Sequence, residues 1–232
     1  MKWPADIAQR VEWNNEIINR AAKEQIAQKI AQKVKDGDVI GVGTGSTSYL
    51  STLAIAERIK NENLRVQVIP AAYEIELTCL ELGIPVTTLK DMKPDWGYDG
   101  ADEVNDQNWL IKGRGGGLFK EKMIMSCSEK TYILVDSSKF VKDLGENFAV
   151  PVECVPESIN MVREQLGNMG ATSMVLRLAQ GKDGPVITEH GNLILDVRFP
   201  VIDADLDKKL KNIVGVVETG LFIGYNIEVI TT

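Results

Sequence analysis

Short apolar segments alternate with helix-like segments between residues 39 and 135, and this alternation limits the fold more than any other feature. The apolar segments at residues 39–42, 64–69, 84–89 and 131–135 have strand character. Helical patterns occupy residues 14–35, 46–60, 73–82 and 118–129. Strands separated by helices predict parallel pairing, because parallel neighbours need a crossover connection. We therefore expect an α/β fold whose mostly parallel, Rossmann-like sheet carries helices on both faces.

The pattern changes near residue 150. Strand character follows at residues 150–155, 172–178, 186–188 and 193–197, and helical character at residues 158–169 and 206–213. The segments at 186–188 and 193–197 are expected to form a hairpin, before a last strand at residues 227–230. This order predicts a small α+β subdomain of residues 148–217, inserted into an α/β catalytic domain of residues 1–147 and 218–232.

Charge and length exclude several classes of partner. The 232 residues carry a formal charge of −7 without a long basic run, which argues against nucleic acid as the main partner. No apolar segment approaches the length of a membrane span, and the first residues are too polar for a signal peptide. We therefore expect a cytoplasmic protein that contacts neither nucleic acid nor membrane.

Cysteine and histidine are too sparse for several kinds of catalysis. Cys79, Cys127 and Cys154 are scattered, which favours reduced thiols over a metal site. His190 is the only histidine, so zinc chemistry and Ser-His or Cys-His catalysis are disfavoured. Because Gly191 and Asn192 follow it, His190 is expected to lie in a hairpin turn. The sequence predicts no metal and no cofactor.

A glycine-rich loop, GVGTGST at residues 41–47, separates a predicted strand from a predicted helix. Its third position for a dinucleotide motif is Ser46 instead of glycine, and no Walker lysine follows. Amides at a helix N-terminus still attract anions, and the hydroxyls of Thr44, Ser46 and Thr47 suit a phosphate monoester. The alternative is a tight turn in which Ser46 or Thr47 caps the helix.

Carboxylates and a lysine gather in the next two motifs, DGADE at residues 99–103 and KGRGGG at residues 112–117. Asp99 and Asp102 flank a turn, and nearby acids tend to have different pKa values, so that one can donate a proton while the other accepts. Lys112 can stabilise a negative oxygen. Glu121 lies in the first turns of the following helix, where it could act as a base or only compensate the helix dipole.

Together these motifs resemble ribose-5-phosphate isomerase of the A type. The likeness rests on GVGTGST, DGADE, KGRGGG with Glu121 nine residues after Lys112, and VDSSK at residues 135–139. PVEC at 151–154, GNLILDV at 191–197 and VGVVETGLF at 214–222 are also similar, so the resemblance runs from about residue 20 to residue 223. It implies an intramolecular oxidoreductase of the pentose phosphate pathway that acts on a small sugar phosphate as a homodimer or homotetramer.

The resemblance also implies roles for individual residues. Glu121 would move the proton between C2 and C1, Lys112 with the amides near Gly113 would stabilise the enediolate, and Asp99 and Asp102 would hold sugar hydroxyls and assist ring opening. The residues implied in binding substrate, the phosphate cradle first, are Lys23, Thr44, Gly45, Ser46, Thr47, Asp99, Gly100, Ala101, Asp102, Lys112, Gly113, Arg114, Gly115 and Lys139.

Three departures from the family pattern leave alternatives open. Arg114 stands where many relatives have glycine, residues 1 to about 20 lie outside the resemblance, and the tail after Phe222 lacks the usual ending. An isomerase of another sugar phosphate is therefore one alternative. A non-catalytic sugar-phosphate sensor is another, and an amino-sugar phosphate deaminase is disfavoured because no histidine accompanies the carboxylates.

Overall fold

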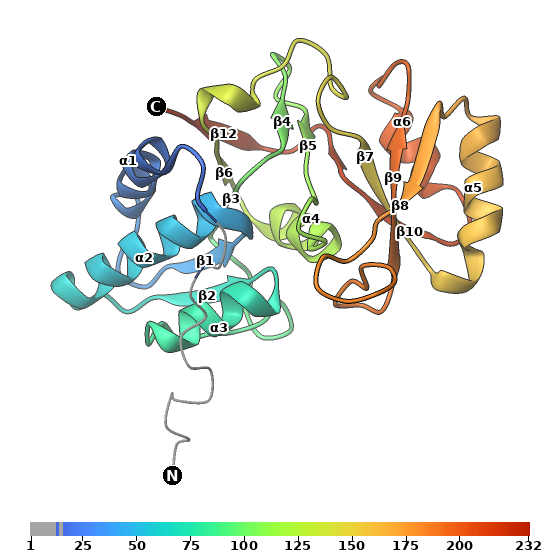
Figure 1. Ribbon diagram of the computed structural model, residues 1–232. Coiled ribbons are helices and arrows are strands. Elements are labelled where there is room, and N and C mark those ends of the chain that lie inside the picture. The colour runs from blue at the N-terminus through green and yellow to red at the C-terminus, as the bar shows by residue number, and fades with distance from the viewer. Residues whose placement is uncertain (1–12, 14–15) are drawn as a thin grey trace. The chain divides into compact units, whose positions relative to one another are not determined.

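The structure, a computed structural model, describes residue 13 and residues 16–232, which form two compact units (Figure 1). The first unit includes the described residues up to Gly100, together with Met123–Ser138 and Asn226–Thr232. The second includes Ala101–Lys122 and Lys139–Tyr225. These units differ from the division predicted at residues 148 and 217, which stays a prediction about the folding domains.

A five-stranded parallel sheet forms the centre of the first unit, in the order β12-β6-β3-β1-β2. Its strands are β1 (Val39–Val42), β2 (Gln67–Pro70), β3 (Trp96–Asp99), β6 (Thr131–Leu134) and β12 (Ile227–Ile230). All except β12 are mostly buried, which explains their apolar composition. The expected α/β class with a parallel sheet is confirmed.

Helices cover both faces of this sheet. Ile40 of β1 packs in one apolar cluster with residues of α1 (Arg20–Ala31), α2 (Gly45–Glu62) and α3 (Tyr73–Glu81). Val39 packs in another cluster with Ile124 of α4 (Leu118–Cys127). Successive strand residues point to opposite faces, so α4 lies across the sheet from the other three helices. Figure 1 shows α1 and α2 side by side.

Two predictions in the first unit need correction. Residues 84–89 form no strand and contribute only an isolated bridge between Val86 and Val68. Pro85 has no amide to donate, which keeps this segment from extending a ladder. The helix predicted at 14–35 is shorter, since α1 ends at Ala31 and begins at Arg20. Its residues 14 and 15, and most of the predicted extension 1–20, lie outside the described residues.

A four-stranded antiparallel sheet forms the centre of the second unit, in the order β10-β7-β9-β8. Its elements are β7 (Val150–Cys154), β8 (Ser173–Leu176), β9 (Leu193–Arg198), β10 (Val216–Thr219), α5 (Ile159–Asn168) and α6 (Leu206–Lys211). Apolar residues of α5, including Val162 and Leu166, pack with those of β7 and β9. The predicted α+β character of this part is confirmed.

The strand predicted at residues 186–188 is wrong. This segment leads to the turn at Glu189 and His190, and β9 pairs instead with β7 and β8. The turn itself contains His190 as expected, and the imidazole ring packs on Phe119 with the ring centroids 4.9 Å apart.

A three-stranded sheet in the second unit lies next to the acidic motif DGADE and the glycine-rich motif KGRGGG. It comprises β4 (Glu103–Val104), β5 (Leu110–Ile111) and β11 (Leu221–Phe222), in the order β11-β5-β4. DGADE leads into β4, and KGRGGG begins directly after β5. Across the described part of the chain, none of the helices combines the length and apolarity that a membrane crossing requires.

Candidate active site

In the first unit, Lys23 of α1 reaches the first turn of α2, directly after the loop that follows β1. Its ammonium donates a hydrogen bond of 3.0 Å to the hydroxyl of Ser46, and the lysine is 9% exposed. The predicted capping by Ser46 or Thr47 is wrong, because α2 begins at Gly45 and its N-cap residue is Thr44. A cation, a hydroxyl and the amides of a helix N-terminus thus lie together, which is an arrangement that binds phosphate.

The carboxylate of Asp99 orders the same loop. It is buried at the end of β3 and accepts hydrogen bonds from the amides of Thr44, at 3.2 Å, and Gly100, at 2.8 Å. A Cβ atom at Gly43 would lie 2.1 Å from Oδ1 of Asp99, so this approach requires glycine. Asp99 therefore supports the loop in addition to any contact with a sugar.

Lys23 also influences Asp136, which begins the DSSK part of the VDSSK motif. Burial alone would raise the pKa of the Asp136 carboxyl, but hydrogen bonds from Ser138 and Asn19 and the charge of Lys23 hold that pKa below its ordinary value. Asp136 is therefore an anion that offsets part of the positive charge of Lys23. The sequence did not single out this aspartate.

In the second unit, Lys112 and Glu121 form a buried ion pair. Nζ of Lys112 lies 3.2 Å from Oε2 of Glu121, and each side chain is only 3% exposed. Lys112 follows β5 and Glu121 lies in the first turn of α4, so the glycine-rich turn between them brings the two side chains together. A carboxylate and an ammonium at this distance can act as a base and as a stabiliser of negative oxygen.

Asp102 lies in the same unit as this pair. Its backbone amide donates to the carbonyl of Ile111, and its Oδ2 accepts from the amide of Arg114 at 3.3 Å. Burial raises the pKa of the Asp102 carboxyl above its ordinary value, and the charges of Lys112 and Lys139 offset only part of this effect. A carboxyl with a raised pKa is suited to exchanging protons.

Arg177 supports the glycine-rich turn from behind. Its guanidinium donates to the carbonyls of Gly113, at 2.7 Å, and Arg114, at 2.9 Å, and pairs with the carboxylate of Asp196. Peptide units whose carbonyls are held in this way have a fixed orientation, and so do the amides of the turn. Ala101 is half-buried, and Arg114 and Gly115 are exposed.

Lys139 and Arg114 both contact the ring of Phe148. Nζ of Lys139 lies 5.3 Å from the ring centroid, and the guanidinium carbon of Arg114 lies 6.0 Å from it. Glu103 orders this segment, because its carboxylate accepts hydrogen bonds from the amides of Gly145, Asn147 and Phe148. The third acid of the DGADE motif thus has a structural role.

The predicted site residues are divided between the units. Lys23, the loop 44–47, Asp99 and Gly100 belong to the first, and Ala101, Asp102, 112–115, Glu121 and Lys139 belong to the second. The sequence missed Arg177 and the partners of Lys122, which are distant in the chain. For Lys122 the available signal is its place beside Glu121, because successive residues of a helix point to different faces.

A parallel α/β unit with a phosphate-type loop, and a second unit with a buried lysine–glutamate pair, define a class: an α/β enzyme that transfers protons on small anions. The comparisons with known proteins give the family. The sequence model of the family ribose 5-phosphate isomerase A (phosphoriboisomerase A) matches residues 67–232. The chain belongs to the ribose 5-phosphate isomerase A family, and the expected membership is confirmed.

Individual relatives agree with this assignment. Ribose-5-phosphate isomerase A of Methanocaldococcus jannaschii is 43% identical over 206 residues, covering 88% of this chain and 91% of the relative. The solved structure of the protein from that organism gives a TM-score of 0.88 at 41% identity, covering 91% of this chain and 95% of the other. A D-ribose-5-phosphate isomerase solved in complex with phospho-erythronic acid gives 0.85 at 37% identity, with 89% and 93% covered.

Proposed function

We propose that this chain interconverts D-ribose 5-phosphate and D-ribulose 5-phosphate by proton transfer through an enediolate, without a metal. The observation that carries the proposal is the buried pair of Lys112 and Glu121, with 3.2 Å between Nζ and Oε2. Membership of the family supports the choice of substrate. A relative in complex with phospho-erythronic acid supports a phosphorylated sugar-like ligand.

Glu121 is the base in this scheme. Its carboxylate removes the proton from C2 of the open-chain aldose, the C1–C2 double bond forms, and the carbonyl electron pair moves to O1. Lys112 stabilises the negative charge on that oxygen, as a metal would do in another enzyme. The proton on O2 passes to O1, Glu121 returns its proton to C1, and O2 becomes the carbonyl oxygen of the ketose.

The remaining residues bind and orient the substrate. Lys23 and the loop 44–47 hold the phosphate, with Ser46 already in contact with Lys23. Asp102 exchanges a proton with a ring or chain hydroxyl during ring opening, which its raised pKa favours. Asp99 contributes to the same sugar contacts. The residues that line the rest of the sugar site are Gly100, Ala101, Gly113, Arg114, Gly115 and Lys139.

The setting of the enzyme is part of the proposal. The reaction is a step of the non-oxidative pentose phosphate pathway, and we propose that the protein performs it in the cytoplasm as a homodimer or homotetramer. Size-exclusion chromatography with light scattering will give the subunit number directly. A monomer at assay concentration would contradict the oligomeric part without affecting the reaction.

An isomerisation assay with excess chelator tests the activity. Ribose 5-phosphate is expected to be the preferred member of a panel of aldose phosphates. Glu121→Gln should reduce turnover by about 10²–10⁴-fold while sugar phosphate still binds. Glu129→Gln, an exposed position just beyond α4, is the matched control and should leave turnover unchanged.

The other outcomes identify the alternatives. Activity confined to another aldose phosphate would favour an isomerase of that sugar. Tight binding without turnover of any sugar would favour a sensor. Turnover that disappears with chelator and returns with a divalent cation would contradict the metal-independent mechanism.

A further inference from the structure

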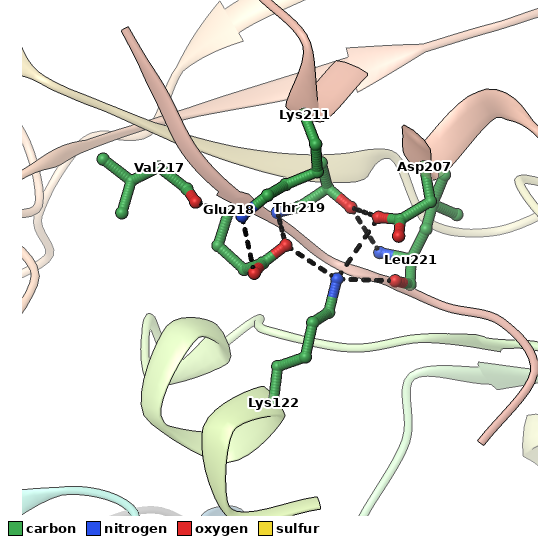
Figure 2. A network of polar contacts seen from close by, with 7 residues as sticks. All are labelled: Lys122, Asp207, Lys211, Val217, Glu218, Thr219 and Leu221. Carbon is green, nitrogen blue, oxygen red and sulfur yellow. Dashed lines mark hydrogen bonds and ion pairs between the residues drawn. The ribbon is translucent and has the colours of Figure 1, made fainter. Parts of the chain in front are cut away.

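We propose that Lys122 is a positioning residue, which fixes the first turn of α4 and thereby holds the carboxylate of Glu121 against Lys112. Lys122 does this through a buried network with Asp207, Glu218 and the carbonyl of Leu221 (Figure 2). The inference rests on the proposed function, since it takes Glu121 as the base.

The ammonium of Lys122 contacts three acceptors on three other elements, α6, β10 and β11. Nζ lies 2.8 Å from Oε1 of Glu218, 2.8 Å from the carbonyl oxygen of Leu221 and 3.2 Å from Oδ1 of Asp207. In Figure 2 the side chain extends from α4 to Glu218 and Leu221, the two ends of the β10–β11 segment (residues 218–221). Only 6% of the Lys122 side chain is exposed, so water screens these contacts little.

The same β10–β11 segment also holds the backbone of Lys112. The amide of Lys112 donates a hydrogen bond of 2.9 Å to the carbonyl of Gly220, and Leu221 pairs with Ile111 in the small sheet. A Cβ atom at Gly220 would lie 2.3 Å from the carbonyl oxygen of Lys112, so glycine is required for this approach. The β10–β11 segment is therefore bonded both to Lys112, at the start of the glycine-rich turn, and to Lys122 of α4, the helix that follows this turn.

The ring of Phe222 adds a further contact between the two lysines. Nζ of Lys112 lies 5.4 Å from the ring centroid, and Nζ of Lys122 lies 4.8 Å from it. Cations at such distances are attracted to the ring face. Phe222 thus links the buried pair of the proposed reaction with the network around Lys122.

Charge balance keeps Lys122 away from the base. Lys122 and Lys211 face the carboxylates of Glu218 and Asp207, so the formal charges of these four side chains cancel. Glu121 and Lys122 are neighbours in the chain, but successive helix residues are rotated by about 100°. Lys122 therefore pairs with Glu218 and Asp207, while Glu121 pairs with Lys112.

Turnover of two variants tests the inference. Lys122→Met should lower kcat on ribose 5-phosphate by about 10²-fold with KM nearly unchanged, because a small displacement of a catalytic group has effects of this size. Lys122→Arg, which restores the charge, should recover most of the loss. Lys209→Met is the control, since this α6 lysine forms only an exposed pair with Asp203 among the ion pairs found.

A second variant separates position from stability. Lys122→Met/Glu218→Met removes both members of the main ion pair and leaves no unpaired Glu218, so it should fold even where Lys122→Met does not. Its kcat per folded molecule should remain low. Its kinetic isotope effect on kcat, measured with substrate deuterated at C2, should be at least as large as that of the wild type. A structural role alone would lower the amount of folded protein without changing either quantity.

Each outcome decides between the two proposals. If the double variant is folded and its kcat lies within about twofold of the wild type, below the loss expected for a displaced group, Lys122 does not position Glu121. If, in addition, the wild type converts ribose 5-phosphate and Glu121→Gln does not, the proposed function stands, and only the inference about Lys122 is contradicted. If the wild type converts no sugar phosphate, the proposed function and the inference fail together.

Discussion

The ammonium of Lys112 and the carboxylate of Glu121 are 3.2 Å apart although nine positions separate them in the chain. Lys112 directly follows the strand β5, and the first turn of α4 contains Glu121. An ammonium and a carboxylate are therefore side by side before any substrate arrives. Such advance placement lowers the reorganisation that the reaction requires.

Lys112→Met tests the electrophilic half of this pair. Loss of the cation that faces the developing oxyanion should reduce kcat by about 10²–10³-fold. The free energy of unfolding should also fall, because Glu121 would lose an ion-pair partner in a buried environment. Steady-state kinetics and urea unfolding check both effects. Lys130→Met, a partly exposed lysine paired with Glu228, is the control; an equal loss of kcat in the control would contradict the role of Lys112.

Lys23→Met tests the proposed phosphate site of the first unit. A charge-assisted hydrogen bond is worth about 1.5–3 kcal/mol, so KM for ribose 5-phosphate should rise by about 10–100-fold with a smaller change in kcat. Inorganic phosphate should inhibit the variant more weakly than the wild type. Lys29→Met, on the same helix, removes an exposed lysine that contacts the carbonyl of Thr231. A similar rise of KM in Lys29→Met would show that only net charge matters.

Asp102→Asn should lower kcat and raise the free energy of unfolding. Burial raises the pKa of Asp102 in the folded state, so ionising this carboxyl at neutral pH opposes folding. The variant should therefore be more stable than the wild type at pH 7, and this difference should vanish below about pH 3.9, the ordinary pKa of aspartate. Urea unfolding at both pH values measures the difference. kcat should fall, and the exposed Asp106→Asn should change neither quantity.

Glu218→Gln should show the opposite pH dependence. Burial alone would raise the pKa of Glu218, but Lys122, Lys211 and the amide of Thr219 hold it below its ordinary value. Its contribution to stability is thus complete above about pH 4.3, the ordinary pKa of glutamate, and is lost as the pH falls through the lower folded value. The variant should be less stable at pH 7 by about 3–5 kcal/mol.

The measurement for Glu218 is the pH profile of unfolding. The difference in unfolding free energy between the wild type and Glu218→Gln should narrow steadily as the pH falls below about 4.3. Glu164→Gln, at an exposed position of α5, should follow the wild type throughout. A gap of constant size at every pH would mean that the carboxyl of Glu218 contributes nothing as a charge.

Local patterns predicted the fold where strand and helix signals were unambiguous. The apolar run of β1 was expected at residues 39–42, where the strand lies, and the parallel sheet followed from the spacing of such runs. Residues 84–89 were apolar enough for a strand, but Pro85 could not donate a ladder bond and the segment forms one bridge. Strands of two residues, such as β4 and β11, are too short to leave a periodic signal.

The candidate site was also predictable only in part, where its residues lie close together in the sequence. Lys112 and Glu121 lie close in the chain, and the family resemblance implied that both act in one site, but it did not predict their direct ion pair. The carboxylate partners of Lys122 are 85 and 96 positions away in sequence, and Arg177, just after β8, lies 64 positions from Gly113. Contacts of this kind depend on tertiary packing, which no local pattern in one sequence encodes.

The three amides bound by Glu103 affect how relatives of this chain should be recognised. A descendant that lost isomerase chemistry would still need a carboxylate there to shape residues 145–148. The final glutamate of DGADE therefore reports an intact scaffold, and its presence does not by itself separate active isomerases from inactive relatives.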